Sequence, residues 1–272
     1  MTILVTGATG HTGGEVVRLL EQRGVALRAA SRATGFDWAD PATFESALDG
    51  VEAAYLLPPP GAFGRLALLA PLLDAAKAAG VRRLVLLSTS VEGVPGQREF
   101  HRAVIEAAPE YAILRPGWFM QNFTGAHPAA REIREHGEVR SATGEGRLSF
   151  VDTGDIAAVA VEALLAAEAP NRDYLITGPE AISYREVAEL IDEVAAYPVK
   201  YVPLSIEQGR ARWASLGLPE ESAAYAAELD RQLADGLEDR VSSTVEDLTG
   251  RPARSFREFA AANRHHWQEQ TH

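Results

Sequence analysis

Short apolar runs alternate with longer amphipathic stretches along the first 115 residues. The short runs are bounded by glycine or proline and predict strands at 3–5, 25–30, 53–57, 83–87 and 111–114. The longer stretches carry apolar residues three or four positions apart and predict helices around 16–20, 63–79 and 100–108. Strands that alternate with helices form a parallel sheet covered on both faces. We therefore expect an α/β protein with a Rossmann-type, doubly wound parallel sheet, to which a helix at 152–167 and a strand at 174–176 also belong.

The pattern changes after Gly178, where helices predominate. Ser183 with Glu186 fits a capping box at the start of one helix, and Ser255 with Glu258 fits one at the start of the last. Between these two helices the pattern predicts a strand at 199–202 and two consecutive helices at 206–216 and 220–234, joined by Gly217 and Leu218.

These patterns suggest two parts along the chain. We expect a dinucleotide-binding Rossmann domain over residues 1–178 and a smaller, mostly helical substrate-binding part over residues 179–272. The pair of consecutive helices has the length of a lid, so we expect a two-helix lid in the second part. Residues 117–147 are expected to contribute to the substrate pocket.

Composition narrows the function classes. A formal net charge of −12 leaves no broad basic surface, so we expect neither a nucleic acid nor a membrane as partner. The chain has no cysteine, which excludes disulfides, thiolate zinc sites and cysteine nucleophiles, and we expect no metal site. The N-terminus lacks a signal-peptide pattern, and no apolar stretch reaches the roughly 18 residues of a membrane helix. We expect a cytoplasmic protein that acts on a small molecule.

A glycine-rich turn, Gly7-Ala8-Thr9-Gly10-His11-Thr12-Gly13, lies between the first predicted strand and the first predicted helix. In a dinucleotide site the first glycine permits a sharp turn, the second admits a pyrophosphate, and the third lets helix and strand pack closely. The amide groups at the helix N-terminus then face the phosphates. The alternative is that the glycines serve only a tight turn. The predicted cofactor-binding residues of this turn are Gly7, Thr9, Gly10, His11, Thr12 and Gly13.

The end of the second predicted strand bears on which dinucleotide binds. Proteins for NAD tend to place an acidic residue about 20 positions after the glycines, on the ribose 2′-hydroxyl. This chain has Ser31 and Arg32 there instead. An arginine can bind a 2′-phosphate through charge-assisted hydrogen bonds, although Arg32 could also be a solvated cation at a strand end. We predict NADP(H) as the cofactor, with Ser31 and Arg32 at the phosphate, Asp37 and Trp38 (with Phe36) around the adenine, and Leu57 and Pro58 at the end of the third strand.

Several motifs resemble the short-chain dehydrogenase/reductase superfamily in its atypical, NmrA-like branch. Besides the glycine turn, they lie at 36–38, 84–90, 114–116, 119–122 and 150–157, so the resemblance covers nearly the whole chain. Within that branch, the sequence pattern of this chain most resembles ergot-alkaloid dehydrogenases and bacterial quinone-reductase-like proteins. The resemblance implies an NAD(P)H-dependent oxidoreductase of ketoreductase type in secondary metabolite biosynthesis, and a monomer or a homodimer.

Ordinary members of that superfamily carry a catalytic Tyr-x-x-x-Lys pair, which this chain lacks. Its two lysines are Lys77 and Lys200, and neither has a tyrosine four residues before it. When the corresponding helix is aligned with the family, Arg98 takes the tyrosine position and Arg102 takes the lysine position, beside the cofactor ribose.

The hydroxyl cluster of the superfamily remains, at residues 88–90. Ser88 and Ser90 could donate hydrogen bonds to a developing oxyanion, and Ser88 is also a cofactor-contact candidate. His101 could supply a proton, and Arg98 could stabilise an alkoxide. The alternative for His101 and Arg98 is a solvated position on the helix surface.

Aromatic residues after the fifth predicted strand and on the helix pair suggest a pocket for a flat substrate, although such residues are often plain core. The candidates are Trp118, Phe119, Met120, Phe123 and Trp213. We predict NADPH-dependent reduction of a ketone on a bulky polycyclic aromatic secondary metabolite. The alternatives are imine, iminium or quinone reduction, a non-catalytic NADP(H)-binding redox-sensing regulator of NmrA type, and an isomerase or epimerase that keeps its nicotinamide bound.

Overall fold

The computed structural model describes residues 1–59, 65–195 and 198–267, which form two compact units. The first unit consists of Met1–Pro116, Thr153–Ile176 and Thr244–Arg251. The second consists of residues 117–152, 177–243 and 252–267.

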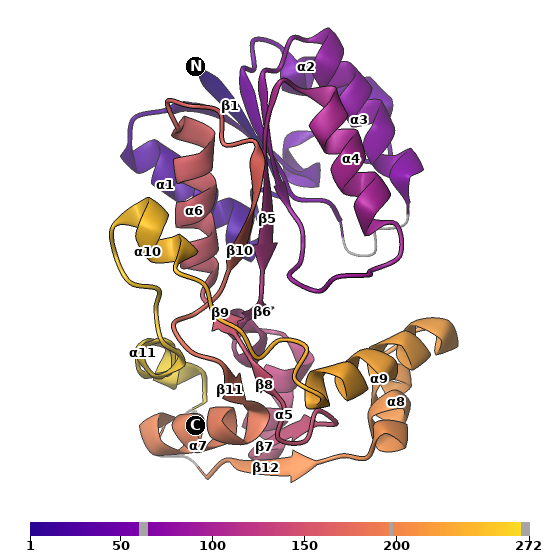
Figure 1. Ribbon diagram of the computed structural model, residues 1–272, viewed down its shortest axis with the longest axis vertical. Coiled ribbons are helices and arrows are strands. Elements are labelled where there is room, and N and C mark those ends of the chain that lie inside the picture. Colours follow the sequence, from indigo (N-terminus) through magenta and orange to yellow (C-terminus); the bar gives the residue numbers. More distant parts are fainter. Residues whose placement is uncertain (60–64, 196–197, 268–272) are drawn as a thin grey trace. The chain divides into compact units, whose positions relative to one another are not determined.

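A six-stranded parallel sheet in the order β10-β5-β4-β3-β1-β2 forms the centre of the first unit. The predicted Rossmann-type α/β fold is therefore confirmed. The strands are β1 (Thr2–Thr6), β2 (Ala26–Ala30), β3 (Ala53–Leu56), β4 (Arg83–Leu87), β5 (Glu110–Pro116) and β10 (Arg172–Ile176). Figure 1 shows α1 (His11–Gln22), α6 (Thr153–Leu165) and α10 (Thr244–Thr249) on one face of this sheet, and α2 (Phe44–Leu48), α3 (Leu66–Ala78) and α4 (Gln97–Ala107) on the other.

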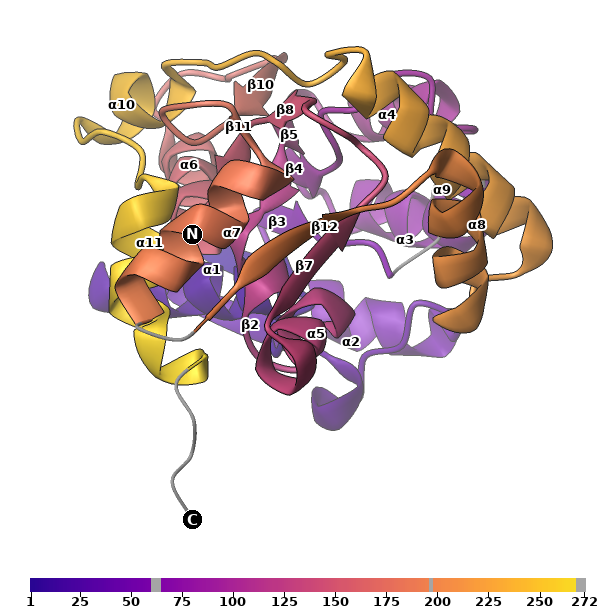
Figure 2. The ribbon, with the colours of Figure 1, turned by 90° about the horizontal axis from the view of Figure 1, so that it is seen from below.

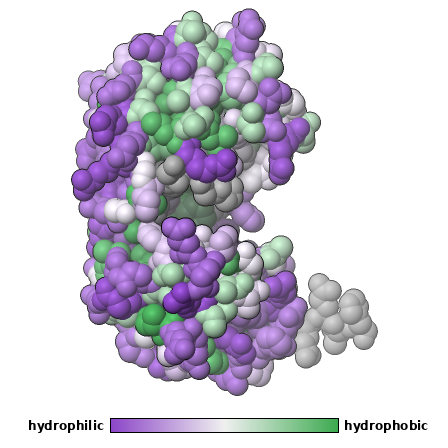
Figure 3. Space-filling view, turned by 90° about the vertical axis from the view of Figure 1, so that its right-hand side faces the viewer, coloured by the Kyte–Doolittle hydropathy of each residue, from purple (hydrophilic) through white to green (hydrophobic). Residues whose placement is uncertain are grey.

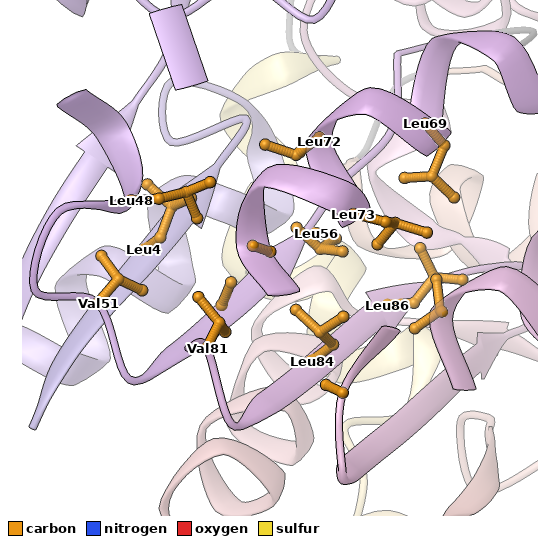
Figure 4. Close-up of a cluster of buried hydrophobic side chains, with 14 of the residues drawn as sticks. Leu4, Leu48, Val51, Leu56, Leu69, Leu72, Leu73, Val81, Leu84 and Leu86 are labelled. Atoms are coloured by element: carbon orange, nitrogen blue, oxygen red, sulfur yellow. The ribbon is translucent and has the colours of Figure 1, made fainter. Parts of the chain in front are cut away.

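The main core of this unit lies between the sheet and the second set of helices. Leu69, Leu72 and Leu73 share one face of α3 because they are spaced three and four residues apart, and all three are buried. Figure 4 shows them beside leucines of the strands, including Leu56 and Leu84. Full burial of one such side chain stabilises the fold by about 1.5–3 kcal/mol, so this face holds the helices on the sheet.

The second unit is built from helices and short strand pairs. Figure 2 shows α5 (Pro128–His136) and α7 (Tyr184–Ala195) beside the pair β7 (Glu138–Ser141) and β12 (Lys200–Pro203). Phe123, Phe150, Tyr184 and Phe256 form a cluster of edge-to-face rings at its core. Its elements are β6 (Trp118–Phe119), α5 (Pro128–His136), β7 (Glu138–Ser141), β8 (Arg147–Leu148), β9 (Phe150–Val151), β11 (Ile182–Ser183), α7 (Tyr184–Ala195), β12 (Lys200–Pro203), α8 (Ile206–Ser215), α9 (Glu220–Ala234) and α11 (Phe256–Asn263).

The chain does not divide at a single boundary after residue 178. Residues 117–152 belong to the second unit because β7 pairs with β12, which needs a partner strand for its backbone hydrogen bonds. Residues 244–251 return to the first unit, where α10 packs against α6 and β10 and Arg251 forms an ion pair with Asp155 at 2.6 Å. The two compact units are thus discontinuous along the chain, while the expected dinucleotide-binding and substrate-binding parts remain predictions.

The exposed surface mixes polar and apolar residues. On the face drawn in Figure 3, hydrophilic residues predominate along the left-hand side. No helix in the described part of the chain is both long enough and apolar enough to cross a membrane.

Candidate functional site

The glycine turn has the close packing that its spacing predicts. Gly7 has a φ of +64°, and a Cβ there would lie 2.6 Å from Leu57 Cδ2. A Cβ on Gly13 would lie 2.2 Å from the Gly7 carbonyl oxygen, so only glycine lets α1 begin this close to the turn. The Gly10 N–H donates a hydrogen bond to that same oxygen at 2.9 Å, which closes the turn.

The N-terminus of α1 suits a phosphate. Gly10 provides no side-chain cap, and the first turn of the helix contains no acidic residue. The leading amide groups of a helix have no partner within the helix, and they carry a partial positive charge. The turn also lies at the point where β2 and β3 flank β1 on opposite sides, which is where sheets of this type bind ligands.

A cavity of about 740 Å³ opens at this turn, entirely within the first unit. Its walls come from the ends of β1, β2 and β3 and from the start of α3. It brings together nine of the predicted cofactor residues, namely Gly7, Thr9, Gly10, Ser31, Arg32, Asp37, Trp38, Leu57 and Pro58. The other predicted cofactor residues, His11, Thr12, Gly13, Ser88 and Arg102, are not part of its lining.

Two arginines give this cavity its positive charge. Arg32 is exposed directly after β2, and Arg65, which the sequence analysis missed, is exposed directly before α3. Neither forms an ion pair with any residue that the structure describes. The signal that could have identified Arg65 is a cation at the start of a helix that follows the strand beside β1.

All three predicted adenine contacts line the cavity, but they differ in exposure. Trp38 is partly exposed, whereas Phe36 is nearly buried, with the two ring centroids 5.8 Å apart. The Asp37 carboxylate accepts a hydrogen bond from the Ala39 N–H at 2.9 Å, so it also orders this loop. Trp38 is therefore the aromatic surface available to a base, and Phe36 mainly holds it in place.

Two of the predicted catalytic residues are in contact. Ser88 at the end of β4 and His101 on α4 are hydrogen bonded, with 2.7 Å between Oγ and Nε2. Burial lowers the pKa of the half-buried His101 imidazole; Asp173 opposes this shift and Arg115 adds to it. The Gln97 amide donates to the Val91 carbonyl at 3.0 Å and so ties the loop after β4 to the start of α4.

The remaining catalytic candidates lie in different environments. Ser90 is fully buried, and its N–H donates to the Pro116 carbonyl at 2.9 Å. Arg98 and Arg102 are both exposed on α4, one helical turn apart, so the alignment with the superfamily places them on the helix surface. A histidine hydrogen bonded to a serine is thus an arrangement that can accept and donate protons near pH 7.

A second cavity, of about 470 Å³, lies within the second unit. Three of the predicted pocket residues line it: Trp118, Phe123 and Trp213. Phe119 and Met120 are not in its lining, and Met120 is packed into the core of this unit with 1% exposure. The lining that the sequence analysis missed includes Asn122, His127, Arg140, Tyr184, Arg212 and Asp230.

The comparison with known families decides the relationship. The model of the NmrA-like family matches residues 36–260. The chain belongs to the NmrA-like family. This confirms the predicted family, although the match by itself names no substrate.

Two curated relatives and one solved structure are similar to this chain over nearly its full length. It is 38% identical to the uncharacterized oxidoreductase YesF of Bacillus subtilis (strain 168), over 97% of this chain and 96% of the relative. It is 35% identical to agroclavine dehydrogenase of Claviceps fusiformis, over 98% and 99% of the two chains. A crystal structure of an NADPH-dependent quinone oxidoreductase from Escherichia coli, complexed with NADPH, superposes with a TM-score of 0.78 at 25% identity, over 96% and 99%. The predicted class, an oxidoreductase, is confirmed.

Proposed function

We propose that this protein reduces a ketone carbonyl on a bulky polycyclic aromatic secondary metabolite. It is an NAD(P)H-dependent oxidoreductase of the NmrA-like family, and NADP(H) is its cofactor. Relatives named as dehydrogenase and quinone oxidoreductase support the reaction class. We infer the ketone from the contact between Ser88 and His101, and the polycyclic skeleton from the aromatic side chains that line the second cavity.

The first cavity fits NADP(H) by shape and by charge. The missing Cβ atoms of Gly7 and Gly13 let the turn pack against Leu57 and the start of α1 pack against the turn, which places the helix N-terminus where a pyrophosphate would bind. Arg65 would add a positive charge for the pyrophosphate, and Arg32 would bind the 2′-phosphate of the adenine ribose. Trp38 would stack on the adenine. NADP(H), when bound, supplies the hydride.

The hydrogen bond between Ser88 and His101 is the observation that carries the choice of a carbonyl. Once hydride adds to a carbonyl carbon, the oxygen becomes an alkoxide and needs one proton. The Ser88 hydroxyl donates its proton to that alkoxide, and a protonated His101 returns one to Ser88 across the 2.7 Å contact. The pair thus performs the task that the superfamily assigns to tyrosine and lysine.

The test is turnover with three substrate classes. Purified protein and NADPH are mixed with a polycyclic aromatic ketone, a quinone or a cyclic imine, and loss of the reduced nicotinamide absorbance is followed. We expect the ketone to be reduced, and Ser88→Ala or His101→Gln to reduce kcat more for the ketone than for the quinone. His136→Gln, an exposed histidine on α5, is the matched control and should leave kcat unchanged.

Three results would change the assignment. Turnover of only the quinone or only the imine would replace the ketone by that class. Binding of both redox forms of the cofactor without turnover of any compound would support the regulator instead. Full ketone activity in both variants would remove Ser88 and His101 from the proton path.

A further inference from the structure

One carboxylate stands out in the cavity of the second unit. Asp230 lies on α9, and its Oδ2 accepts a hydrogen bond from the Trp213 indole N–H at 3.0 Å. No residue that the structure describes gives its Oδ1 a hydrogen bond. A carboxylate has several lone pairs, so Asp230 retains accepting capacity on the side of the cavity.

The environment of Asp230 favours a cationic partner. Burial raises the pKa of its carboxyl, while the Trp213 hydrogen bond and the charge of Arg212 oppose that shift. Desolvation disfavours a charged carboxylate that lacks a close counter-ion. A cation placed against Oδ1 would offset this cost.

The cavity also contains two arginines, but both are engaged by glutamates outside its lining. Arg212 forms a two-pronged ion pair with Glu132, at 3.1 and 2.7 Å, and its guanidinium carbon lies 5.4 Å from the centre of the Trp213 ring, so it occupies one face of that ring and leaves the other for a ligand. Arg140 Nε donates to Glu138 at 2.7 Å, and Lys200 pairs with the other oxygen of that carboxylate at 3.2 Å. The glutamates offset the arginine charges locally, which leaves Asp230 as the carboxylate that a ligand in this cavity can reach.

Aromatic side chains supply the rest of the recognition. Trp118, Phe123, Tyr184 and Trp213 all line the cavity. Ring faces attract cations, and they also stack on flat ligands. The volume of about 470 Å³ is in the range of small-molecule sites and is large enough for a fused-ring compound.

We infer that the cavity of the second unit binds flat, fused-ring aromatic cations, with the Asp230 carboxylate as their counter-ion and the ring faces of Trp213 and Tyr184 as stacking surfaces. If the proposed reductase function holds, this inference narrows its substrate to a polycyclic aromatic compound that carries a protonated basic nitrogen. Only the ligand's role as the substrate rests on the proposed function, because binding in the cavity can be measured without turnover.

The test compares two ligands that differ mainly in charge. 9-Aminoacridine is a flat tricyclic cation at neutral pH, and acridine is a near-isosteric neutral compound. Both are titrated into the full-length protein by calorimetry, with Asp230→Asn as the isosteric neutral variant. Glu221→Gln removes one carboxylate from an exposed position on the same helix, outside the cavity lining, and is the matched control.

The expected preference follows from a partly buried, charge-assisted contact. We expect wild-type protein and Glu221→Gln to bind 9-aminoacridine about tenfold to a hundredfold more tightly than acridine. Asp230→Asn should bind acridine as before and reduce the preference to below threefold. Equal affinity of the wild-type protein for the two ligands would overturn the inference, and so would a preference that Asp230→Asn retains.

The outcomes separate this inference from the proposed function. NADPH titration and ketone turnover test the first unit's role, and the acridine pair tests the second unit's cavity. A protein that binds 9-aminoacridine selectively but neither binds NADPH nor reduces any compound would refute the reductase and keep the cation site. If the protein reduces ketones but binds 9-aminoacridine and acridine equally, the reductase function is kept and the cation site is refuted.

Discussion

Arg32 should determine the preference for NADPH over NADH. It is exposed in the wall of the first cavity, and no described residue forms an ion pair with it. A shielded charge-assisted hydrogen bond contributes about 1.5–3 kcal/mol, and an exposed ion pair contributes about 0.2–1 kcal/mol. Because the cavity is open to solvent at Arg32, we take about 1 kcal/mol, which weakens the Kd for NADPH about fivefold in Arg32→Ala.

Arg65 provides the contrast within the same cavity. It precedes α3, which follows the strand beside β1, so we expect it to act on the pyrophosphate that both cofactors share. Arg65→Ala should therefore weaken NADPH and NADH alike, by about fivefold each. Arg32→Ala should leave the Kd for NADH unchanged. The double variant should show nearly additive losses, because each arginine meets a different phosphate.

Calorimetric titration of each cofactor at about 0.15 M salt measures these losses, and a repeat at about 0.5 M salt should shrink them by screening. Arg18→Ala on α1 is the control, because that side chain is exposed, pairs with Glu15 and lies outside the cavity lining. If Arg32→Ala weakens NADPH and NADH equally, or neither of them, Arg32 does not bind the 2′-phosphate.

Three further predictions follow from single features of the structure. A lowered pKa leaves His101 mostly neutral at pH 7, so kcat for the ketone should rise as the pH falls through that pKa, below about 6.5. His101→Gln should lower kcat about a hundredfold and flatten the pH profile. A pH profile that His101→Gln leaves unchanged would contradict the proton path. Gly13→Ala places a Cβ within 2.2 Å of the Gly7 oxygen, so urea unfolding should show a free energy of unfolding lower by about 1–3 kcal/mol, and NADPH binding should be lost. Gly14→Ala is the control and should be tolerated, because the nearest atom to its Cβ lies at 3.4 Å. Equal effects of the two variants would refute the packing argument. Insertion of two glycines after Gly217, in the loop between α8 and α9, should change kcat and KM together if this helix pair is a lid, and unaltered steady-state kinetics would argue against one.

Local sequence patterns determined most of the secondary structure. The two helices predicted at 206–216 and 220–234 correspond to α8 and α9, because the capping box of Ser205 and Gln208 acts between neighbouring residues. The constraint on Gly13 is also local, since its missing Cβ would meet Gly7 and Thr6, whereas the close contact of Gly7 with Leu57 depends on the pairing of β1 with β3. Periodicity missed α2, α5 and α10, the four-residue strand β7 and the two-residue strands, because each is shorter than the window over which a repeat can be recognised.

Pairings between distant segments required the tertiary structure. The sequence named Ser88 and His101 separately, but only the packing of α4 against β5, the neighbour of β4 in the sheet, brings their side chains into contact. The sequence provided no reason to connect Arg65 with Arg32, because α2 and β3 lie between them in the chain. It also did not pair Asp230 with Trp213, because that contact depends on how α8 and α9 pack against each other.

The chain's own pattern thus determined that strands and helices alternate and where the glycine turn lies, since these depend on spacings within a few residues and on a repeated alternation. Packing alone decided which polar groups face one another, and where a charge is left without a partner, because those facts depend on how remote elements fill space around each side chain.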